Sequence, residues 1–119
     1  MSKTIIIVDN DPAVLSNYAD FLRPKLVAAG ADVVMMDSPQ AVLDHVAAHG
    51  HPFAVLSDNN MDEMDGTDLA LALRKAGYRG RFVLLTGLPE KAQVTEGTID
   101  VILEKPAGVR EIRKALAFS

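Results

Sequence analysis

Five short apolar runs, none of which alternates with polar residues, set the strongest limit on how this chain can fold. They are Ile5–Val8, Val33–Met36, Phe53–Leu56, Phe82–Leu85 and Val101–Leu103. Continuous apolar runs of this length are typical of strands covered on both faces of a parallel sheet. Between the runs, apolar residues recur at helical spacing. Alternating strands and helices with right-handed crossovers predict a five-stranded doubly wound α/β domain.

Prolines mark where the helices between these runs begin. Pro12, Pro39 and Pro89 stand near expected helix starts, where a missing N–H costs little. Pro24 lies inside the first helical pattern, so we expect it to kink or end that helix. The stretch 88–98 has room for at most a short helix. Strand and helix therefore alternate along the chain with two irregular passages.

The composition narrows the classes of function. A chain of 119 residues suits one domain, residues 1–119. The net charge of −4 has the wrong sign for binding a phosphate backbone, so we expect no nucleic-acid partner. The chain has no cysteine, which excludes disulfides and cysteine zinc sites. The first apolar run is too short for a signal peptide or a membrane span, and we expect a cytoplasmic protein without a membrane partner.

Polar side chains follow four of the predicted strands. Asp9 follows the first strand, Asp58 the third, Thr86 the fourth and Lys105 the fifth. Ligands of open α/β sheets bind beyond the carboxyl ends of the strands, so we expect these side chains to meet at one edge. Clustered carboxylates need a cation, and oxygen ligands without nearby His or Cys select a hard ion such as Mg²⁺. The pattern predicts a site for Mg²⁺ and a phosphoryl group.

Asp58 is the residue expected to react. It follows the run expected at the centre of the sheet, and a carboxylate beside a metal can attack phosphorus to form an aspartyl phosphate. Thr86 is expected to donate to one phosphoryl oxygen, and Lys105 to balance the charge of another. Gly87 leaves room for the incoming group.

Four segments resemble, in order, the motifs of the receiver domains of two-component response regulators. They are residues 6–12 (IIVDNDP), 56–66 (LSDNNMDEMDG), 84–87 (LLTG) and 103–106 (LEKP). The resemblance covers essentially the whole chain. It implies a flavodoxin-like (βα)5 fold, with a five-stranded parallel sheet in the order 2-1-3-4-5.

The resemblance also implies a function. Asp58 is expected to accept a phosphoryl group from a sensor histidine kinase or a histidine phosphotransfer protein, and to lose it by self-catalysed dephosphorylation, with no other enzyme activity. A stand-alone receiver would then signal through phosphorylation-dependent binding to a target protein. The expected ligands of the Mg²⁺ cofactor are Asp9, Asn10, Asp58 and the backbone carbonyl of Asn60. The expected contacts of the phosphoryl group are Thr86, Gly87 and Lys105.

Three features depart from the family pattern. Asn10 stands where the family has a second acidic residue that contacts the metal, so we expect weaker Mg²⁺ binding and slower phosphorylation. Ile102 occupies the switch position, where the family has an aromatic residue. The usual coupling between the threonine and that ring therefore cannot operate. The interval from Thr86 to Lys105 is short, so we expect the fourth helix to be abbreviated.

Two acidic residues are candidates to replace the charge missing at position 10. Asp11 is one, although its place before Pro12 is also typical of a helix N-cap. Asp62 is the other, and it stands where a proline is common in the family. Asp65, before Gly66, is expected to cap the next helix rather than to bind metal.

Two other functions fit parts of the pattern. The first is an atypical pseudo-receiver that acts as a phosphorylation-independent binding module, which Asn10 and Ile102 favour. The second is a haloacid-dehalogenase-type phosphohydrolase, because Asp9 and Asp11 after an apolar strand resemble the nucleophile motif of that family. The phosphohydrolase would form its phosphoenzyme at Asp9, whereas a receiver would form it at Asp58. A flavin-binding flavodoxin fits less well, because the loop after the first strand lacks a phosphate cradle.

Overall fold

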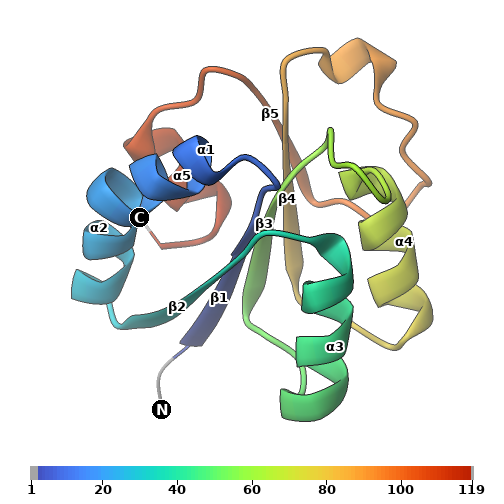
Figure 1. The fold of residues 1–119 in the computed structure, drawn as a ribbon, viewed down its shortest axis with the longest axis horizontal. Coiled ribbons are helices and arrows are strands. Elements are labelled where there is room, and N and C mark those ends of the chain that lie inside the picture. Colours follow the sequence, from blue (N-terminus) through green and yellow to red (C-terminus); the bar gives the residue numbers. More distant parts are fainter. Residues whose placement is uncertain (1–2, 119) are drawn as a thin grey trace.

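The structure contains the sheet that the apolar runs predict. It is a computed structural model and describes residues 3–118. The strands are β1 (Lys3–Val8), β2 (Ala31–Met36), β3 (Ala54–Asp58), β4 (Arg81–Thr86) and β5 (Val101–Glu104). Every pair is parallel, and the strand order is β2-β1-β3-β4-β5 (Figure 1). The predicted order 2-1-3-4-5 is confirmed.

Helices cover both faces of this sheet. On one side lie α1 (Pro12–Asn17), α2 (Arg23–Ala28) and α5 (Val109–Ala115), and on the other lie α3 (Pro39–His49) and α4 (Gly66–Lys75) (Figure 1). Within residues 3–118, no helix has the length and apolar character needed to cross a membrane.

Successive side chains of β1 point to opposite faces of the sheet and pack into two separate cores. Ile5 and Ile7 pack in the core with α2 and α5, whereas Ile6 and Val8 pack in the core with α3 and α4. All four side chains are buried, and burial of a side chain of this size stabilises a fold by about 1.5–3 kcal/mol. This double burial explains why the strand shows no alternation of polar residues.

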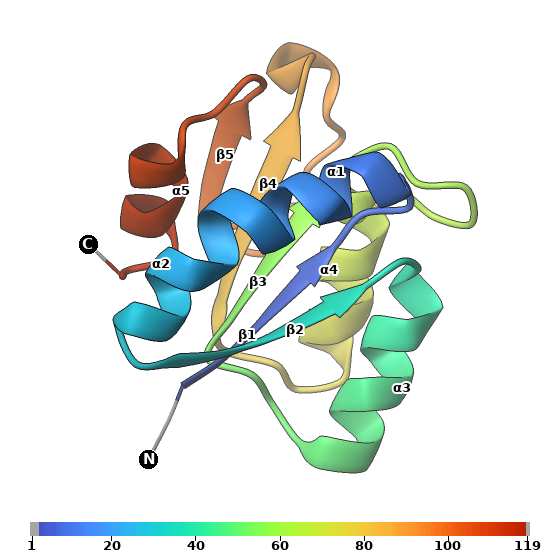
Figure 2. The same cartoon turned by 60° about the vertical axis from the view of Figure 1, so that its left-hand side comes forward.

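The first helix continues past Pro24. A π-helical turn, η1 (Tyr18–Leu22), lies between α1 and α2, and in it the N–H of Arg23 donates to the carbonyl of Tyr18. A proline inside a helix has no N–H to donate and needs room at the carbonyl four residues earlier, which a widened turn supplies. Figure 2 shows α1 and α2 as one continuous helix across the sheet. The disturbance expected at Pro24 is therefore a widened turn and not a helix end.

The stretch before β5 is mostly irregular. It holds one short 3₁₀ helix, η2 (Pro89–Lys91), in agreement with the abbreviated helix expected there. Arg74 at the end of α4 anchors this stretch. Its side chain donates to the Thr98 carbonyl at 3.1 Å and forms an ion pair with Asp100 at 3.1 Å. Asp100 in turn accepts the N–H of Phe82 at 2.7 Å. Side-chain hydrogen bonds thus hold a segment that lacks helical structure.

Candidate functional site

Hydrogen bonds around the end of β3 fix the backbone of Asp58. The Ser57 hydroxyl donates to the Asp58 carbonyl at 2.8 Å, and the N–H of Asn59 donates to the Leu85 carbonyl at 3.0 Å. The loop that follows is closed where the N–H of Gly66 donates to the Asn59 carbonyl at 2.8 Å. The Asp58 residue is only 7% exposed. Its carboxylate is therefore held at the carboxyl edge of the sheet by a rigid strand end.

Gly66 allows α4 to begin directly against Asp58. A Cβ atom at Gly66 would lie 2.5 Å from the Asp58 carbonyl oxygen and 2.6 Å from Cδ1 of Leu84. Both distances are far below an ordinary contact, so a larger residue would push the helix off the strand. The absence of a side chain at Gly66 thus allows α4 to pack closely against the end of β3 at Asp58.

Lys105 forms an ion pair with Asp58. Its Nζ contacts Oδ1 of Asp58, and the two side chains are 36% and 8% exposed respectively. The backbone N–H of Lys105 donates to the Thr86 carbonyl at 2.9 Å, which anchors the residue at the end of β4. The pair neutralises one charge of the acidic edge. Sequence reasoning placed these two side chains at one edge, and they meet there.

Asp9 lies beside this pair as a buried acid. Its Oδ1 accepts the N–H of Asp11 at 2.9 Å, whereas its Oδ2 is buried without a hydrogen-bond partner. Burial raises the pKa of Asp9, and repulsion from Asp58 raises it further, against the opposing effects of the Asp11 N–H and Lys105. A buried carboxylate oxygen without a partner is the kind of atom that a bound cation would satisfy.

The expected metal ligands form an all-oxygen set. Asn10 follows Asp9 and is half-buried, and Asn60 is exposed on the loop after β3. Within the described part of the chain, no three His, Cys, Asp or Glu side chains form a group that could hold a metal ion. Two carboxylates with an amide and a backbone carbonyl still suit a hard divalent ion, which keeps several waters. The unpartnered Asp9 oxygen leaves one ligand atom available for such an ion.

Thr86 and its neighbours complete the edge. The Thr86 hydroxyl accepts the N–H of Leu88 at 3.1 Å, so its oxygen is hydrogen-bonded within the loop that follows β4. A Cβ at Gly87 would meet nothing within 4 Å, and the space there is open. Ile102 pairs in register with Leu84, which belongs to the core under α3 and α4, and it is 39% exposed. Position 102 therefore presents an apolar surface and no hydroxyl.

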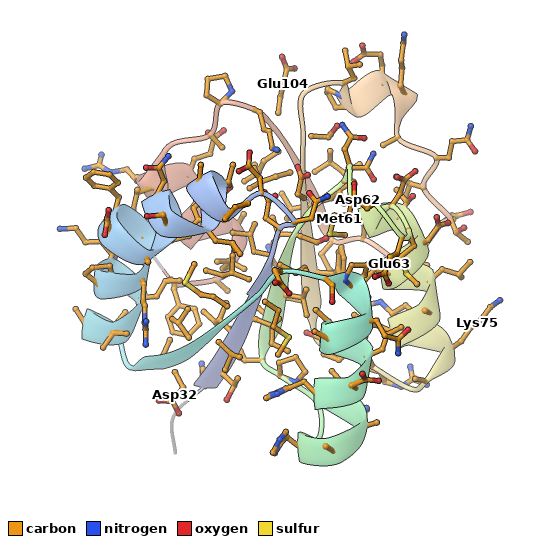
Figure 3. All side chains as sticks on the ribbon, in the orientation of Figure 1. Asp32, Met61, Asp62, Glu63, Lys75 and Glu104 are labelled. Atoms are coloured by element: carbon orange, nitrogen blue, oxygen red, sulfur yellow. The ribbon has the colours of Figure 1, made fainter. Side chains whose placement is uncertain are left out.

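The two acidic residues considered as replacements for the missing charge occupy different environments. Asp11 is the N-cap of α1, and its Oδ1 accepts the N–H of Ala13 at 2.9 Å. The capping interpretation of Asp11 is confirmed. Asp62 is exposed on the loop that leads to α4, and Figure 3 shows Glu104 projecting from the same end of the molecule.

Tyr18 is a neighbour of the site that the sequence did not indicate. It lines a cavity of about 440 Å³ between α1 and the segment after β5, together with Leu85 and Lys105. Burial raises the pKa of Tyr18 to about 12, with contributions from the charges of Asp9 and Asp58. Helical spacing groups Tyr18 with other apolar residues of its helix, but it does not fix which part of the sheet that helix crosses.

Comparison with known proteins identifies relatives. A sequence model described as the response regulator receiver domain matches residues 5–117. No curated protein sequence matches the chain. A CheY-like receiver domain from Methylobacillus flagellatus has a TM-score of 0.81 at 21% identity, with all of both chains covered. The chemotaxis regulator CheY4 of Vibrio cholerae has a TM-score of 0.81 at 22% identity, over 98% of each chain. The receiver domain of the putative regulator NarL from Mycobacterium tuberculosis has a TM-score of 0.81 at 26% identity, over 98% of this chain and 94% of its own.

Proposed function

This chain belongs to the family of response regulator receiver domains, and on that premise we propose that Asp58 accepts a phosphoryl group. The donor is a histidine kinase or a histidine phosphotransfer protein in the cytoplasm. The modified chain then signals by binding a target protein. Apart from this transfer and the later loss of the phosphoryl group, the chain catalyses no reaction.

The contact between Lys105 and Asp58 is the observation that carries the proposal. It joins two motif residues that are far apart in the sequence and brings an ammonium group onto a carboxylate that is 8% exposed. Asp9 lies near enough for its charge to interact with both. A cation beside two acids at the carboxyl edge of a parallel sheet suits the binding of a phosphoryl group.

The proposed transfer breaks one bond to phosphorus and forms another. Lys105 contacts Oδ1 of Asp58, so we assign the attack on phosphorus to Oδ2. As the new O–P bond forms, the bond from phosphorus to the donor atom breaks, and the electron pair leaves with the donor. Lys105 then balances the charge on a phosphoryl oxygen, and the Thr86 hydroxyl turns from Leu88 to donate to another.

Mg²⁺ belongs to this proposal as the cofactor. Asp9, through its unpartnered Oδ2, and Asp58 would hold the ion together with the Asn10 amide oxygen and the Asn60 carbonyl. When bound, Mg²⁺ supplies positive charge that offsets the repulsion between the acids and the phosphoryl oxygens. With Asn10 in place of an acid, this chain contributes one negative charge fewer to the ion.

Intact-mass analysis after treatment with acetyl phosphate and Mg²⁺ tests the proposal. We expect one added phosphoryl group on the wild-type chain and none on Asp58→Asn. Glu63→Gln is the matched control, because it makes the same acid-to-amide change at an exposed acid of the following loop, and it should be modified like the wild type. An unmodified wild-type chain would favour the pseudo-receiver that Asn10 and Ile102 suggest. A modified Asp58→Asn chain would contradict the assignment of Asp58.

A further inference from the structure

We infer that Tyr18 is a positioning residue, whose ring keeps the Lys105 side chain against Asp58 and so sets the rate at which Asp58 is phosphorylated. The inference rests on the proposed function. Its geometric basis is the cavity of about 440 Å³ that Tyr18 and Lys105 line together. No motif of the family includes position 18 in this chain, because the matching segments are residues 6–12, 56–66, 84–87 and 103–106.

Lys105 needs a support of this kind because its side chain is long and partly exposed. The backbone of Lys105 is anchored to the Thr86 carbonyl, but four rotatable carbons separate that anchor from Nζ. The side chain is 36% exposed, so solvent surrounds part of it. Holding such a side chain in one rotamer costs conformational entropy, which packing against a rigid wall reduces.

Tyr18 supplies a rigid wall on one side of Lys105. Its backbone carbonyl accepts the N–H of Arg23 in the π-helical turn, and its side chain packs against the core that contains Leu22 and Ile112. Leu85 of β4 lines the same cavity from the sheet, and Pro106 lines it from the segment after β5. Lys105 therefore borders a cavity that helix, sheet and the segment after β5 line together.

The Tyr18 side chain carries no charge at physiological pH. The pKa of Tyr18 is raised to about 12 by burial and then by the charges of Asp9 and Asp58, so the group stays neutral at physiological pH. A neutral ring does not compete with Asp58 for the ammonium group of Lys105. The ring, and not the hydroxyl, is thus the part of Tyr18 that this inference requires.

The kinetics of phosphorylation by acetyl phosphate test the inference. We expect Tyr18→Leu to lower the maximal rate about tenfold, because a small displacement of a charge-balancing group has effects of this size. Tyr18→Phe keeps the ring and should retain the wild-type rate within about twofold. Half-saturation by Mg²⁺ should be unchanged in both variants, since neither replaces a proposed ligand. A merely structural role for Tyr18 would not separate the maximal rate from Mg²⁺ binding in this way.

A double-mutant cycle in urea unfolding supplies a readout that does not depend on activity. Tyr18→Leu and Lys105→Ala should show a coupling in stability, since the two side chains line the same cavity. Leu15→Ala is the matched control, because Leu15 lies on α1, directly before η1, and packs against the same core without lining the cavity. Leu15→Ala and Lys105→Ala should be additive in stability, and Leu15→Ala should keep the wild-type maximal rate.

The outcomes separate this inference from the proposed function. A wild-type chain that takes no phosphoryl group would overturn the proposed function, and the stability cycle would still report whether Tyr18 couples to Lys105. A phosphorylated wild type with an equally fast Tyr18→Leu variant would overturn the inference alone. The inference would also be overturned if Tyr18→Phe were phosphorylated as slowly as Tyr18→Leu. The same holds if the stability effects of Tyr18→Leu and Lys105→Ala were additive.

Discussion

The side chains of Lys105 and Asp58 meet across an intervening strand. Asp58 ends β3 and Lys105 follows β5, while β4 lies between those strands in the sheet. Their contact thus depends on the parallel order of three strands and on the level at which each strand ends. The ion pair is a direct product of the fold, and several consequences of this arrangement can be measured.

The Asp9→Asn variant should be more stable than the wild type at neutral pH in the absence of Mg²⁺. Burial, followed by repulsion from Asp58, raises the pKa of Asp9 in the folded chain, so its ionisation disfavours folding. Stability is therefore lost as the pH rises from 3.8 through the higher folded-state pKa of Asp9. Urea unfolding should show the advantage of Asp9→Asn shrinking as the pH falls toward 3.8. A variant that is less stable than the wild type at neutral pH would contradict this reading of Asp9.

The Gly66→Ala variant should lose about 1–3 kcal/mol of unfolding free energy, because its Cβ would overlap the Asp58 carbonyl and Leu84. Gly87→Ala is the matched control. A Cβ at Gly87 meets nothing within 4 Å, so the unfolding free energy of Gly87→Ala should stay within about 0.5 kcal/mol of the wild-type value. Thermal or urea unfolding of both variants measures the difference. Equal stabilities would show that α4 does not press on the Asp58 strand end.

The Asn10→Asp variant should bind Mg²⁺ about tenfold more tightly than the wild type, because a third carboxylate joins Asp9 and Asp58. Without Mg²⁺ the same variant should be less stable, since the added charge repels two acids. Calorimetric titration with Mg²⁺ measures the affinity. Gln93→Glu adds a charge on an exposed residue of the irregular stretch and should change neither property. An unchanged affinity of Asn10→Asp would place the cation away from position 10.

The Arg74→Lys variant should lose about 2 kcal/mol of unfolding free energy while keeping its phosphorylation by acetyl phosphate. The Arg74 guanidinium donates to the carbonyls of Thr98 and Gly80 and pairs with Asp100, and one ammonium group cannot reach all three. Arg79→Lys, at an exposed arginine nearby, should be close to neutral. A loss of phosphorylation in Arg74→Lys would show that the irregular stretch before β5 is coupled to Asp58.

Much of the fold could be predicted from the sequence, because burial on both faces leaves a strong signal. Runs such as Ile5–Val8 show no polar alternation, and all five runs lie in strands of the sheet except for Phe53, which directly precedes β3. The placement of polar residues followed from the same rule. Asp9, Asp58 and Lys105 each stand at or just after a strand end, and parallel strands bring those ends to one edge. Their chemical roles stay predictions.

The remaining features depend on contacts that no local pattern encodes. Helical spacing groups Tyr18 with other apolar residues, but only the path of the helix across the strands brings Tyr18 and Lys105 to the same cavity. Gly66 belongs to a recognised motif, yet its reason, a close approach of helix and strand, is visible only in three dimensions. The rule that proline kinks or ends a helix predicts an irregularity at Pro24, but it does not predict the widened π-helical turn that precedes it.

Reductive trapping of the phosphorylated residue tests the central assignment most directly. Borohydride reduces an acyl phosphate to a primary alcohol, so a phosphorylated aspartate becomes homoserine, which peptide sequencing by mass spectrometry locates. After treatment with acetyl phosphate and Mg²⁺, we expect homoserine at position 58 and at no other aspartate. Homoserine at position 9 would instead support the phosphohydrolase chemistry that the Asp9 and Asp11 pair resembles. That result would contradict the assignment of Asp58.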